Sequence, residues 1–246
     1  MIAALGMYDL PAVQGANDRF WQAIRARLGR GPGHLTRDQD FWDIWRSPDL
    51  LFAQTCGMPY RTALHGHVQL IGTPDYGLDG CPPGFYQSVL VVRADDPRQS
   101  EDAFGGARFA FNEPVSQSGW AAPMVHLRAR AVTMGDLVQT GAHAASARAV
   151  AEGRADLAGL DALTWALLQE HDPVAGQLRV LARTDPTPGL PYITSMGQDA
   201  DALFSAVRDA IRDLETADRD ALHLKDLIAI PADAYLAVPT PPPPAE

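Results

Sequence analysis

The segment 140–161 contains the residues best suited to bind a small anion. Its sequence predicts a turn, then a helix over 143–152 with His143 in its first turn, then an apolar strand over 155–160 that leads to Asp161. A helix N-terminus presents backbone N–H groups and a partial positive charge, which suit an oxyanion. The strand returns a carboxylate toward the same edge. This segment therefore predicts a pocket that holds a small anion and does not cleave a bond.

Two further segments place hydroxyl and amide groups at predicted junctions between a strand and a helix. They are Gln54-Thr55-Cys56-Gly57 and Ser116-Gln117-Ser118-Gly119. Ligands of open α/β sheets settle at the carboxyl ends of strands, where such junctions gather. Serine and threonine hydroxyls donate to anion oxygens, and small residues let backbone amides come close. The three junctions together favour an anion site.

Each of these residues also has a structural interpretation. Ser116 and Ser118 are suitable helix N-caps, and Asp161 is a suitable N-cap for the helix predicted over 162–170. A histidine such as His143 readily satisfies local backbone groups. In the functional interpretation, Asp161 accepts a hydrogen bond from a protonated oxyanion or pairs with an ammonium group of the ligand. The sequence leaves both interpretations open.

Two tyrosines, Tyr8 and Tyr86, lie at the ends of predicted strands. From these positions a phenol can point into the same cleft as the anion-binding junctions. Tyrosine is intermediate in burial, so packing with the hydroxyl at the surface is an equally good interpretation. Both tyrosines are candidates for ligand contact.

The sequence gives little support for catalysis. It contains no G-x-S-x-G elbow, no Walker A loop, no G-x-G-x-x-G, no H-E-x-x-H and no C-x-x-C. His65 and His67 lack a nearby third ligand for a metal ion, and the apolar residues before Cys56 favour a buried, unreactive thiol. We therefore expect no catalytic residue, no metal and no cofactor. An enzyme that uses His143 or Cys56 is the less favoured alternative.

Strands and helices alternate after His143, which predicts parallel βαβ units and an α/β fold class. Strands are expected over 155–160 and 178–183, with a helix over 162–170 between them. The proline-rich end, 239–246, is expected to be a flexible, solvated tail. Earlier in the chain we expect strands over 1–10, 50–57, 68–71, 86–93 and 108–112, a helix from 17 or 18 to 28, and a late helix with Leu203, Val207, Ile211 and Leu214 on one face.

Composition and charge exclude several classes of protein. The chain has 246 residues, of which 46% are hydrophobic, and a formal net charge of -10, so it offers little basic surface to a nucleic acid. Its mean hydropathy is -0.12, and no apolar run approaches the roughly 18 residues of a membrane span, so no membrane insertion is expected. Only Cys56 and Cys81 could form a disulfide, and the sequence does not decide whether they do.

Six segments in this order carry a resemblance to a known family. They are Met7-Tyr8-Asp9, 54–59, 86–93, Asn112 with Ser116-Gln117-Ser118-Gly119, 141–161 and 187–191. In combination they resemble the PhnD-like phosphate/phosphite/phosphonate-binding proteins of ABC transporters. The resemblance implies a type II periplasmic-binding-protein fold, with two α/β lobes joined by two hinge crossings and a ligand cleft between them. Lobe one would comprise 1–92 plus 183–246, and lobe two 93–182.

The resemblance also implies a role for each candidate residue. In lobe two, Ser116, Gln117, Ser118 and His143 would hold the oxygens of the anion. Tyr8, Thr55 and Tyr86 would form the facing wall in lobe one. The protein would then capture a phosphate, phosphite or phosphonate and deliver it to an ABC permease.

Two features depart from the family pattern. Binders of aminoalkyl phosphonates use acidic residues in the second lobe, and only Asp161 is plainly positioned here, which favours a smaller oxyanion. The segment 1–9 has neither a basic start nor a long apolar stretch, so it does not read as a secretory signal. The family implies a periplasmic protein, whereas the chain is expected to be cytoplasmic if its start is complete. The alternative function is a cytoplasmic sensor of the same fold for another small metabolite.

Overall fold

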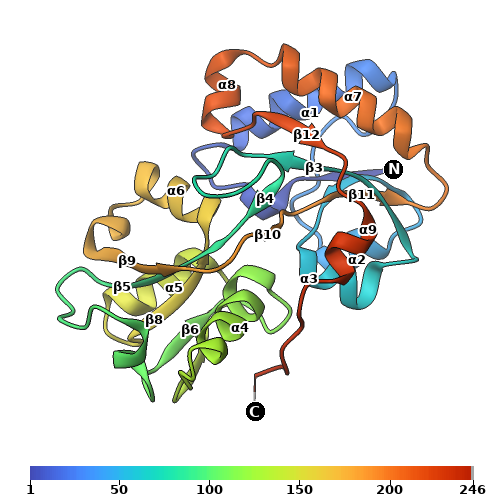
Figure 1. Cartoon of the computed structure of the whole chain (residues 1–246). Coiled ribbons are helices and arrows are strands. Elements are labelled where there is room, and N and C mark those ends of the chain that lie inside the picture. The colour runs from blue at the N-terminus through green and yellow to red at the C-terminus, as the bar shows by residue number, and fades with distance from the viewer. Residues whose placement is uncertain (245–246) are drawn as a thin grey trace. The chain divides into compact units, whose positions relative to one another are not determined.

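The computed structural model describes residues 1–244, which divide into two compact units (Figure 1). Unit 1 comprises Met1–Phe85 and Pro188–Ala237, and unit 2 comprises Tyr86–Thr187 and the segment from Val238 onward. The sequence places the divisions at 92/93 and 182/183 instead. In the structure the strands over 88–93 and 178–183 lie wholly in unit 2, and so does the C-terminal segment that the sequence assigns to lobe one.

A five-stranded sheet forms the centre of unit 1. β1 and β2 are parallel, β11 is antiparallel to β2 and β3, and β12 is antiparallel to β3. Every residue of β2 is buried, because helices cover both faces of the sheet. In sheet order, the strands are β1 (Ile2–Ala4), β2 (Leu50–Gln54), β11 (Tyr192–Ser195), β3 (Val68–Asp75) and β12 (Asp226–Ile228).

The helices of unit 1 form two layers, one on each face of this sheet (Figure 1). On one face, Trp21 of α1 stacks on Phe52 of β2 with ring centroids 5.9 Å apart. On the other, Trp45 and Tyr235 join the cluster around Leu50. The first layer holds α1 (Gln14–Leu28), α7 (Ala200–Asp213) and α8 (Thr216–Ala221), and the second holds α2 (Phe41–Arg46), α3 (Gly57–Pro59), the π-helix Tyr60–Leu64 and α9 (Ala232–Leu236).

Unit 2 is also built on a five-stranded sheet. β6 is parallel to β7 and β8, whereas β5 is antiparallel to β8 and β9. The sheet is therefore mixed, and the parallel pairing that the sequence predicts holds for only part of it. In sheet order, the strands are β7 (Leu137–Gln139), β6 (Phe109–Phe111), β8 (Leu157–Asp161), β5 (Ser88–Arg93) and β9 (Leu178–Arg183).

Helices cover both faces of the unit 2 sheet as well. Leu90 and Val92 of β5 pack in a cluster with Leu127 of α4, while Val89 and Val91 point to the other face and are equally buried. Within residues 1–244 no helix is long and apolar enough to cross a membrane. The helices are the 3-10 helix Glu101–Phe104, the π-helix Gln117–Ala121, α4 (Ala122–Ala129), α5 (His143–Ala151), α6 (Ala162–His171) and the 3-10 helix Pro173–Gln177.

The N-terminal segment differs from its prediction. The strand expected over 1–10 ends at Ala4, and the chain continues as the 3-10 helix Gly6–Tyr8. Tyr8 therefore lies in a helical turn and not at the end of a strand. The short strands β4 (Phe85–Tyr86) and β10 (Thr187–Pro188) pair with each other where the chain passes from one unit to the other.

The proline-rich tail makes a specific contact within unit 2. The indole Nε1 of Trp120 donates a hydrogen bond to the backbone oxygen of Pro242, at 3.0 Å. The tail expected to be flexible covers 239–246, and its last two residues lie outside the described part of the chain. The described part of the tail is thus bonded to the helical turn that follows the Ser116–Gly119 segment.

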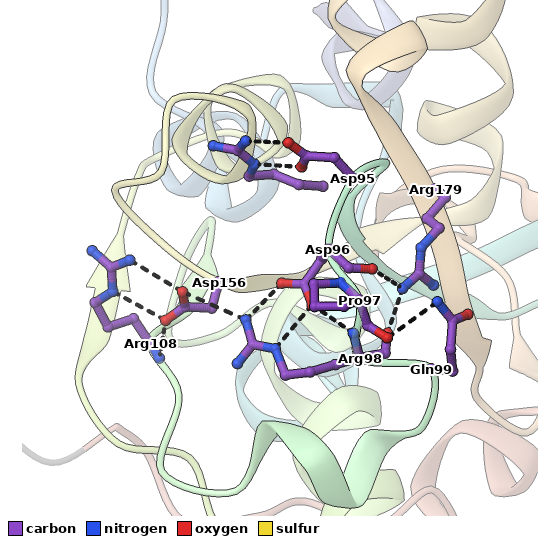
Figure 2. Close-up of polar contacts among 9 residues, drawn as sticks. Asp95, Asp96, Pro97, Arg98, Gln99, Arg108, Asp156 and Arg179 are labelled. Carbon is purple, nitrogen blue, oxygen red and sulfur yellow. Dashed lines mark hydrogen bonds and ion pairs between the residues drawn. The ribbon is translucent and has the colours of Figure 1, made fainter.

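At one end of the unit 2 sheet, arginines and aspartates pair with one another (Figure 2). Asp156, just before β8, accepts hydrogen bonds from the Nε and Nη2 of Arg108, at 3.0 and 3.1 Å. Arg98 pairs with Asp96 at 2.6 Å, and Arg179 donates to the backbone oxygen of Asp96 at 3.0 Å. We call this end the far edge, and its charged residues are Arg93, Asp95, Asp96, Arg98, Arg108, Asp156 and Arg179.

Candidate functional site

The opposite end of the unit 2 sheet brings together most of the predicted binding residues. The parallel strands β6, β7 and β8 all end here, and the antiparallel strand β5 begins here, with Ser88 opposite Asp161. The segments that carry Ser118 and His143 follow β6 and β7, so both leave the sheet at this end. We call it the carboxyl edge. The topology confirms that the junctions around Ser118, His143 and Asp161 share one edge.

The serine turn is fixed by a cap and by two close approaches. Ser116 is the N-cap of the π-helix, and its Oγ accepts a hydrogen bond from the backbone N of Gly119 at 2.9 Å. A Cβ on Gly119 would lie 1.9 Å from Oδ1 of Asn112, and a Cβ on Gly159 of β8 would lie 3.0 Å from the backbone oxygen of Gly119. The turn therefore packs directly on the sheet, which only glycine permits at these two positions. The capping interpretation of Ser116 is confirmed.

Ser118 has a different partner from Ser116. Its Oγ lies 3.0 Å from Nε2 of His143, which joins the serine turn to the start of α5. His143 is the first residue of α5, as the sequence predicts, and the N-cap position Ala142 supplies no side-chain hydrogen bond. The first turn of α5 is therefore free of a side-chain cap, and its N–H groups suit an oxyanion.

The electrostatics of His143 make it a hydrogen-bonding group and not a cation. Burial lowers the pKa of His143 from 6.5 to about 4, and a polar contact with the backbone of Gly159 opposes this shift in part. The imidazole is therefore neutral at pH 7. A neutral imidazole donates from one nitrogen and accepts at the other, so the tautomer decides whether Ser118 donates to it or accepts from it.

Asp161 caps α6. Its Oδ1 accepts hydrogen bonds from the backbone N of Leu163 at 2.8 Å and of Thr164 at 3.0 Å, and the residue is only 2% exposed. The capping interpretation of Asp161 is therefore confirmed. Its contact with a ligand stays a prediction.

Two polar atoms at the carboxyl edge were not singled out from the sequence as binding atoms. Oγ of Ser88 and Oδ1 of Asn112 are buried and have no hydrogen-bond partner among residues 1–244. A buried polar atom without a partner costs free energy, about 1–3 kcal/mol, so these two atoms are candidates for contact with a ligand. Their position at a strand terminus is the signal that would have found them, since Thr55 was selected on that same ground.

Gln117 and Tyr86 are both buried in unit 2. Gln117 is 2% exposed within the serine turn, and Tyr86 is 3% exposed two residues before Ser88. Tyr86 is the first residue of unit 2. The sequence places Tyr86 on the facing wall of lobe one, whereas in the structure it belongs to the same unit as Ser118.

Tyr8 and Thr55 belong to unit 1. Thr55 follows β2 and is fully buried, and its backbone N donates to the oxygen of Pro191 at 3.0 Å. Its Oγ1 has no hydrogen-bond partner in the described part of the chain. The ring of Tyr8 meets that of Tyr76 edge to face, with centroids 5.4 Å apart. Thr55 therefore repeats in unit 1 the pattern of Ser88 and Asn112, a buried polar atom at the end of a strand.

The other residues considered for chemistry are not grouped. Within residues 1–244 no three histidine, cysteine or acidic side chains lie together so as to hold a metal ion. His65 and His67 are exposed. No disulfide joins Cys56 and Cys81.

Comparison with known proteins identifies one family. The family model described as the phosphonate periplasmic substrate-binding protein of ABC transporters matches residues 48–234. Comparison with curated protein sequences finds no match.

Solved structures share the fold at low sequence identity. PhnD1 from Prochlorococcus marinus in complex with methylphosphonate superimposes with a TM-score of 0.76 at 16% identity, over 95% of this chain and 94% of that one. A binding-protein component of an ABC phosphonate transporter from Pseudomonas aeruginosa gives 0.74 at 16%, over 95% and 83%. The VFT2 domain of Bordetella pertussis BvgS, as a double mutant, gives 0.59 at 18%, over 90% of each chain. The α/β, two-lobed periplasmic-binding-protein fold predicted from the sequence is confirmed.

Proposed function

Because this chain belongs to the phosphonate-binding family of ABC transporter periplasmic substrate-binding proteins, we propose that it captures a small phosphorus oxyanion for delivery to an ABC permease. Proteins of this family bind substrates for transport and are not enzymes. The ligand would be of the phosphate, phosphite or phosphonate class. The methylphosphonate complex of PhnD1 supports this class, since that protein has the same fold.

The observation that carries the proposal is the set of polar groups at the carboxyl edge of unit 2. Ser118 and His143 bond to each other there, the first turn of α5 has no side-chain cap, and Ser88 and Asn112 each bury an oxygen without a partner. The hydroxyls of Ser88 and Ser118 and the N–H groups of α5 supply donors for oxygens of an anion. A bound oxyanion would thus accept hydrogen bonds from the Ser88 hydroxyl and from the N–H groups of α5, and a protonated oxygen of the same ion would donate to Oδ1 of Asn112.

Neutral donors account for anion binding in a chain of net charge -10. His143 carries no charge at neutral pH, and backbone N–H groups and hydroxyls act through their dipoles. Such local dipoles decide the affinity for a small ion more than the net charge does. The site therefore suits a compact oxyanion with several acceptor oxygens.

The capping role of Asp161 favours a ligand without an ammonium group. One carboxylate oxygen already accepts two backbone hydrogen bonds at the start of α6. An aminoalkyl phosphonate would need a carboxylate to pair with its ammonium group, and Asp161 is the acidic residue that the sequence offered for that purpose. We therefore rank phosphate, phosphite and methylphosphonate above 2-aminoethylphosphonate.

In unit 1, Thr55 and Tyr8 are the proposed contacts to the same ligand. The support for Thr55 is its buried Oγ1 without a partner at the end of β2. The support for Tyr8 is that its ring is held edge to face against the ring of Tyr76. In unit 2, Ser116, Gln117 and Tyr86 complete the proposed set with the residues already described.

Isothermal titration calorimetry against phosphate, phosphite, methylphosphonate and 2-aminoethylphosphonate tests the proposal. Ser118→Ala and His143→Ala should each weaken binding by roughly 1–3 kcal/mol, the cost of losing a hydrogen bond to a charged group. Ser100→Ala and His171→Ala are matched controls, because both residues lie in unit 2 outside the proposed site. The controls should keep the affinity of the unmodified protein.

Two outcomes would contradict the proposal in different ways. The absence of heat with all four compounds would exclude the phosphorus oxyanions as ligands. Binding that is unchanged in both Ser118→Ala and His143→Ala would show that the carboxyl edge is not the site. Urea denaturation of each variant distinguishes a lost contact from a lost fold.

A further inference from the structure

Unit 1 contains a pocket that the proposed function does not use. Its volume is about 660 Å³, within the range of about 300–1,000 Å³ that is usual for small-molecule sites. It is formed by the end of α2 with the turn before β2, by the π-helix Tyr60–Leu64 with the turn before β3, and by the end of β11 with the turn that follows it. The lining residues are Trp45, Arg46, Ser47, Pro48, Ala63, His67, Ser195, Met196 and Gly197.

The pocket lies at the end of the unit 1 sheet opposite Thr55. It adjoins the start of β2 at Leu50 and the end of β11 at Ser195, whereas Thr55 follows the last residue of β2. The five residues of β2 separate the two ends by roughly 16 Å, at about 3.3 Å per residue. A ligand in this pocket is therefore distinct from one that contacts Thr55.

Three polar side chains of the pocket have no hydrogen-bond or ion-pair partner in the described structure. The guanidinium carbon of Arg46 lies 4.7 Å from the ring centroid of Trp42, and Arg46 forms no ion pair with any carboxylate of residues 1–244. The imidazole of His67 is exposed and makes no hydrogen bond within that same range. Ser195 is 7% exposed, and its Oγ is buried without a hydrogen-bond partner.

The walls of the pocket are held in place by other residues. Nε2 of Gln69 donates to the backbone oxygens of Ser195, Met196 and Gln198, at 3.0, 3.2 and 2.8 Å, which fixes the turn after β11. The indole Nε1 of Trp45 donates to the backbone oxygen of Gln54 at 3.0 Å, which fixes the aromatic wall. A pocket with fixed walls loses little conformational entropy when it binds.

From this arrangement we propose a second ligand site in unit 1, for a small organic anion with an apolar body. The Arg46 guanidinium binds the carboxylate or phosphate group, because its planar donors match two oxygens of such a group. The Ser195 hydroxyl donates to the same group and thereby gains a partner. Trp45 and Met196 receive the apolar body of the ligand. An unpaired arginine beside a buried, unpartnered hydroxyl is the feature that assigns an anion and not a neutral ligand.

Titration calorimetry with benzoate and with phenyl phosphate as probes tests this site. Arg46→Gln and Ser195→Ala should each weaken the binding of the preferred probe by about tenfold or more, since each removes a hydrogen bond to a charged group. Arg30→Gln is the matched control, an exposed arginine of unit 1 that forms no ion pair in the described residues. Ser195→Ala removes a hydroxyl that has no partner, so the midpoint of thermal unfolding should stay the same or rise.

The outcomes separate this site from the carboxyl edge. Binding that depends on Arg46 and Ser195, and is unchanged in His143→Ala, supports the proposal, and the stronger probe identifies a carboxylate or a phosphate as the charged group. A change in the NMR signal of the Met196 methyl group on titration supports it as well. The proposal is overturned if neither probe binds, if Arg46→Gln and Ser195→Ala bind as the unmodified protein does, or if His143→Ala alone abolishes binding.

Discussion

The two edges of the unit 2 sheet differ in whether their polar side chains have partners within the protein. At the far edge, side chains with full charges pair with one another (Figure 2). The Asp156 carboxylate, for example, accepts hydrogen bonds from both the backbone N and the guanidinium of Arg108. At the carboxyl edge the Asp161 carboxylate bonds to backbone N–H groups, the other proposed binding groups are neutral, and the buried oxygens of Ser88 and Asn112 have no hydrogen-bond partner among residues 1–244. The same strands, β5, β6 and β8, run between these edges.

This difference indicates where stability and recognition are located. Ion pairs near the surface contribute modestly, but their charges are satisfied, so the far edge holds strand starts and loops together at little cost. A buried oxygen without a partner costs about 1–3 kcal/mol. We expect such an oxygen only where another interaction compensates for this cost. We propose that hydrogen bonds to a ligand at the carboxyl edge provide this compensation.

The largest effect should come from Gly119→Ala at the carboxyl edge. The added Cβ would lie 1.9 Å from Oδ1 of Asn112, so either the Asn112 side chain must rotate away or the serine turn must shift. We expect a loss of about 1–3 kcal/mol in the free energy of unfolding from overpacking, and loss of oxyanion binding. Urea denaturation and calorimetry measure the two effects. Gly176→Ala is the control, since nothing lies within 4 Å of its added Cβ. A Gly119→Ala protein that binds the oxyanion as tightly as the unmodified protein would show that the serine turn is not part of the binding site.

A smaller effect, on stability alone, should follow from Asp156→Ala at the far edge. This change removes the acceptor for the backbone N and the guanidinium of Arg108. The free energy of unfolding should fall by about 1 kcal/mol, because the exposed Arg108 guanidinium is screened by solvent and the main loss is the hydrogen bond from its backbone N. Ligand affinity should not change, since Asp156 lies at the opposite end of β8 from Asp161. If this variant binds the ligand more weakly under conditions in which it is fully folded, ligand binding at the carboxyl edge depends on the ion pairs of the far edge.

The smallest effect, a change in pH dependence, sharpens the comparison further. Burial lowers the pKa of His143 from 6.5 to about 4, and hydrogen bonding to Arg108 lowers the pKa of Asp156 below 3.8. The unfolded state binds the proton of His143 more readily than the folded state does, so stability falls as the pH drops from 6.5 to about 4. The stability from Asp156 is complete above its unfolded pKa and is lost as the pH falls through its lower folded pKa.

Urea denaturation between pH 7 and pH 3 checks these two windows. His143→Gln should remove the loss of stability between 6.5 and about 4, and Asp156→Asn should reduce only the loss below 3.8. An unchanged slope between pH 6.5 and 4 in His143→Gln would mean that the imidazole is not held neutral by burial.

Local sequence patterns predicted much of unit 2. The helix expected over 143–152 is His143–Ala151, and the strand expected over 178–183 is Leu178–Arg183. Asp161 ends a strand and starts a helix, as its type and position indicated. These features depend on periodicity and capping, which involve residues within a few positions of one another. Such patterns can be read without the tertiary structure.

The failures involve contacts between distant parts of the chain. The first strand ends at Ala4, because the chain turns into the 3-10 helix that carries Tyr8. The assignment of Tyr86 and of the C-terminal segment to unit 2 depends on packing and on the bond from Trp120 to Pro242. No local sequence pattern encodes the packing of Tyr86 or the bond between Trp120 and Pro242.

The sequence alone determined the types of many elements, the family resemblance and the residue types that suit an oxyanion. It did so because helix and strand signals, caps and motif order are properties of neighbouring residues. Only the tertiary structure decided what each polar group does. Ser116 and Asp161 became caps, Ser118 met His143 at 3.0 Å, and Ser88 and Asn112 were left without partners. Whether a polar group finds a hydrogen-bond partner depends on which strands end beside one another. The order of the strands is fixed only when the sheet has formed.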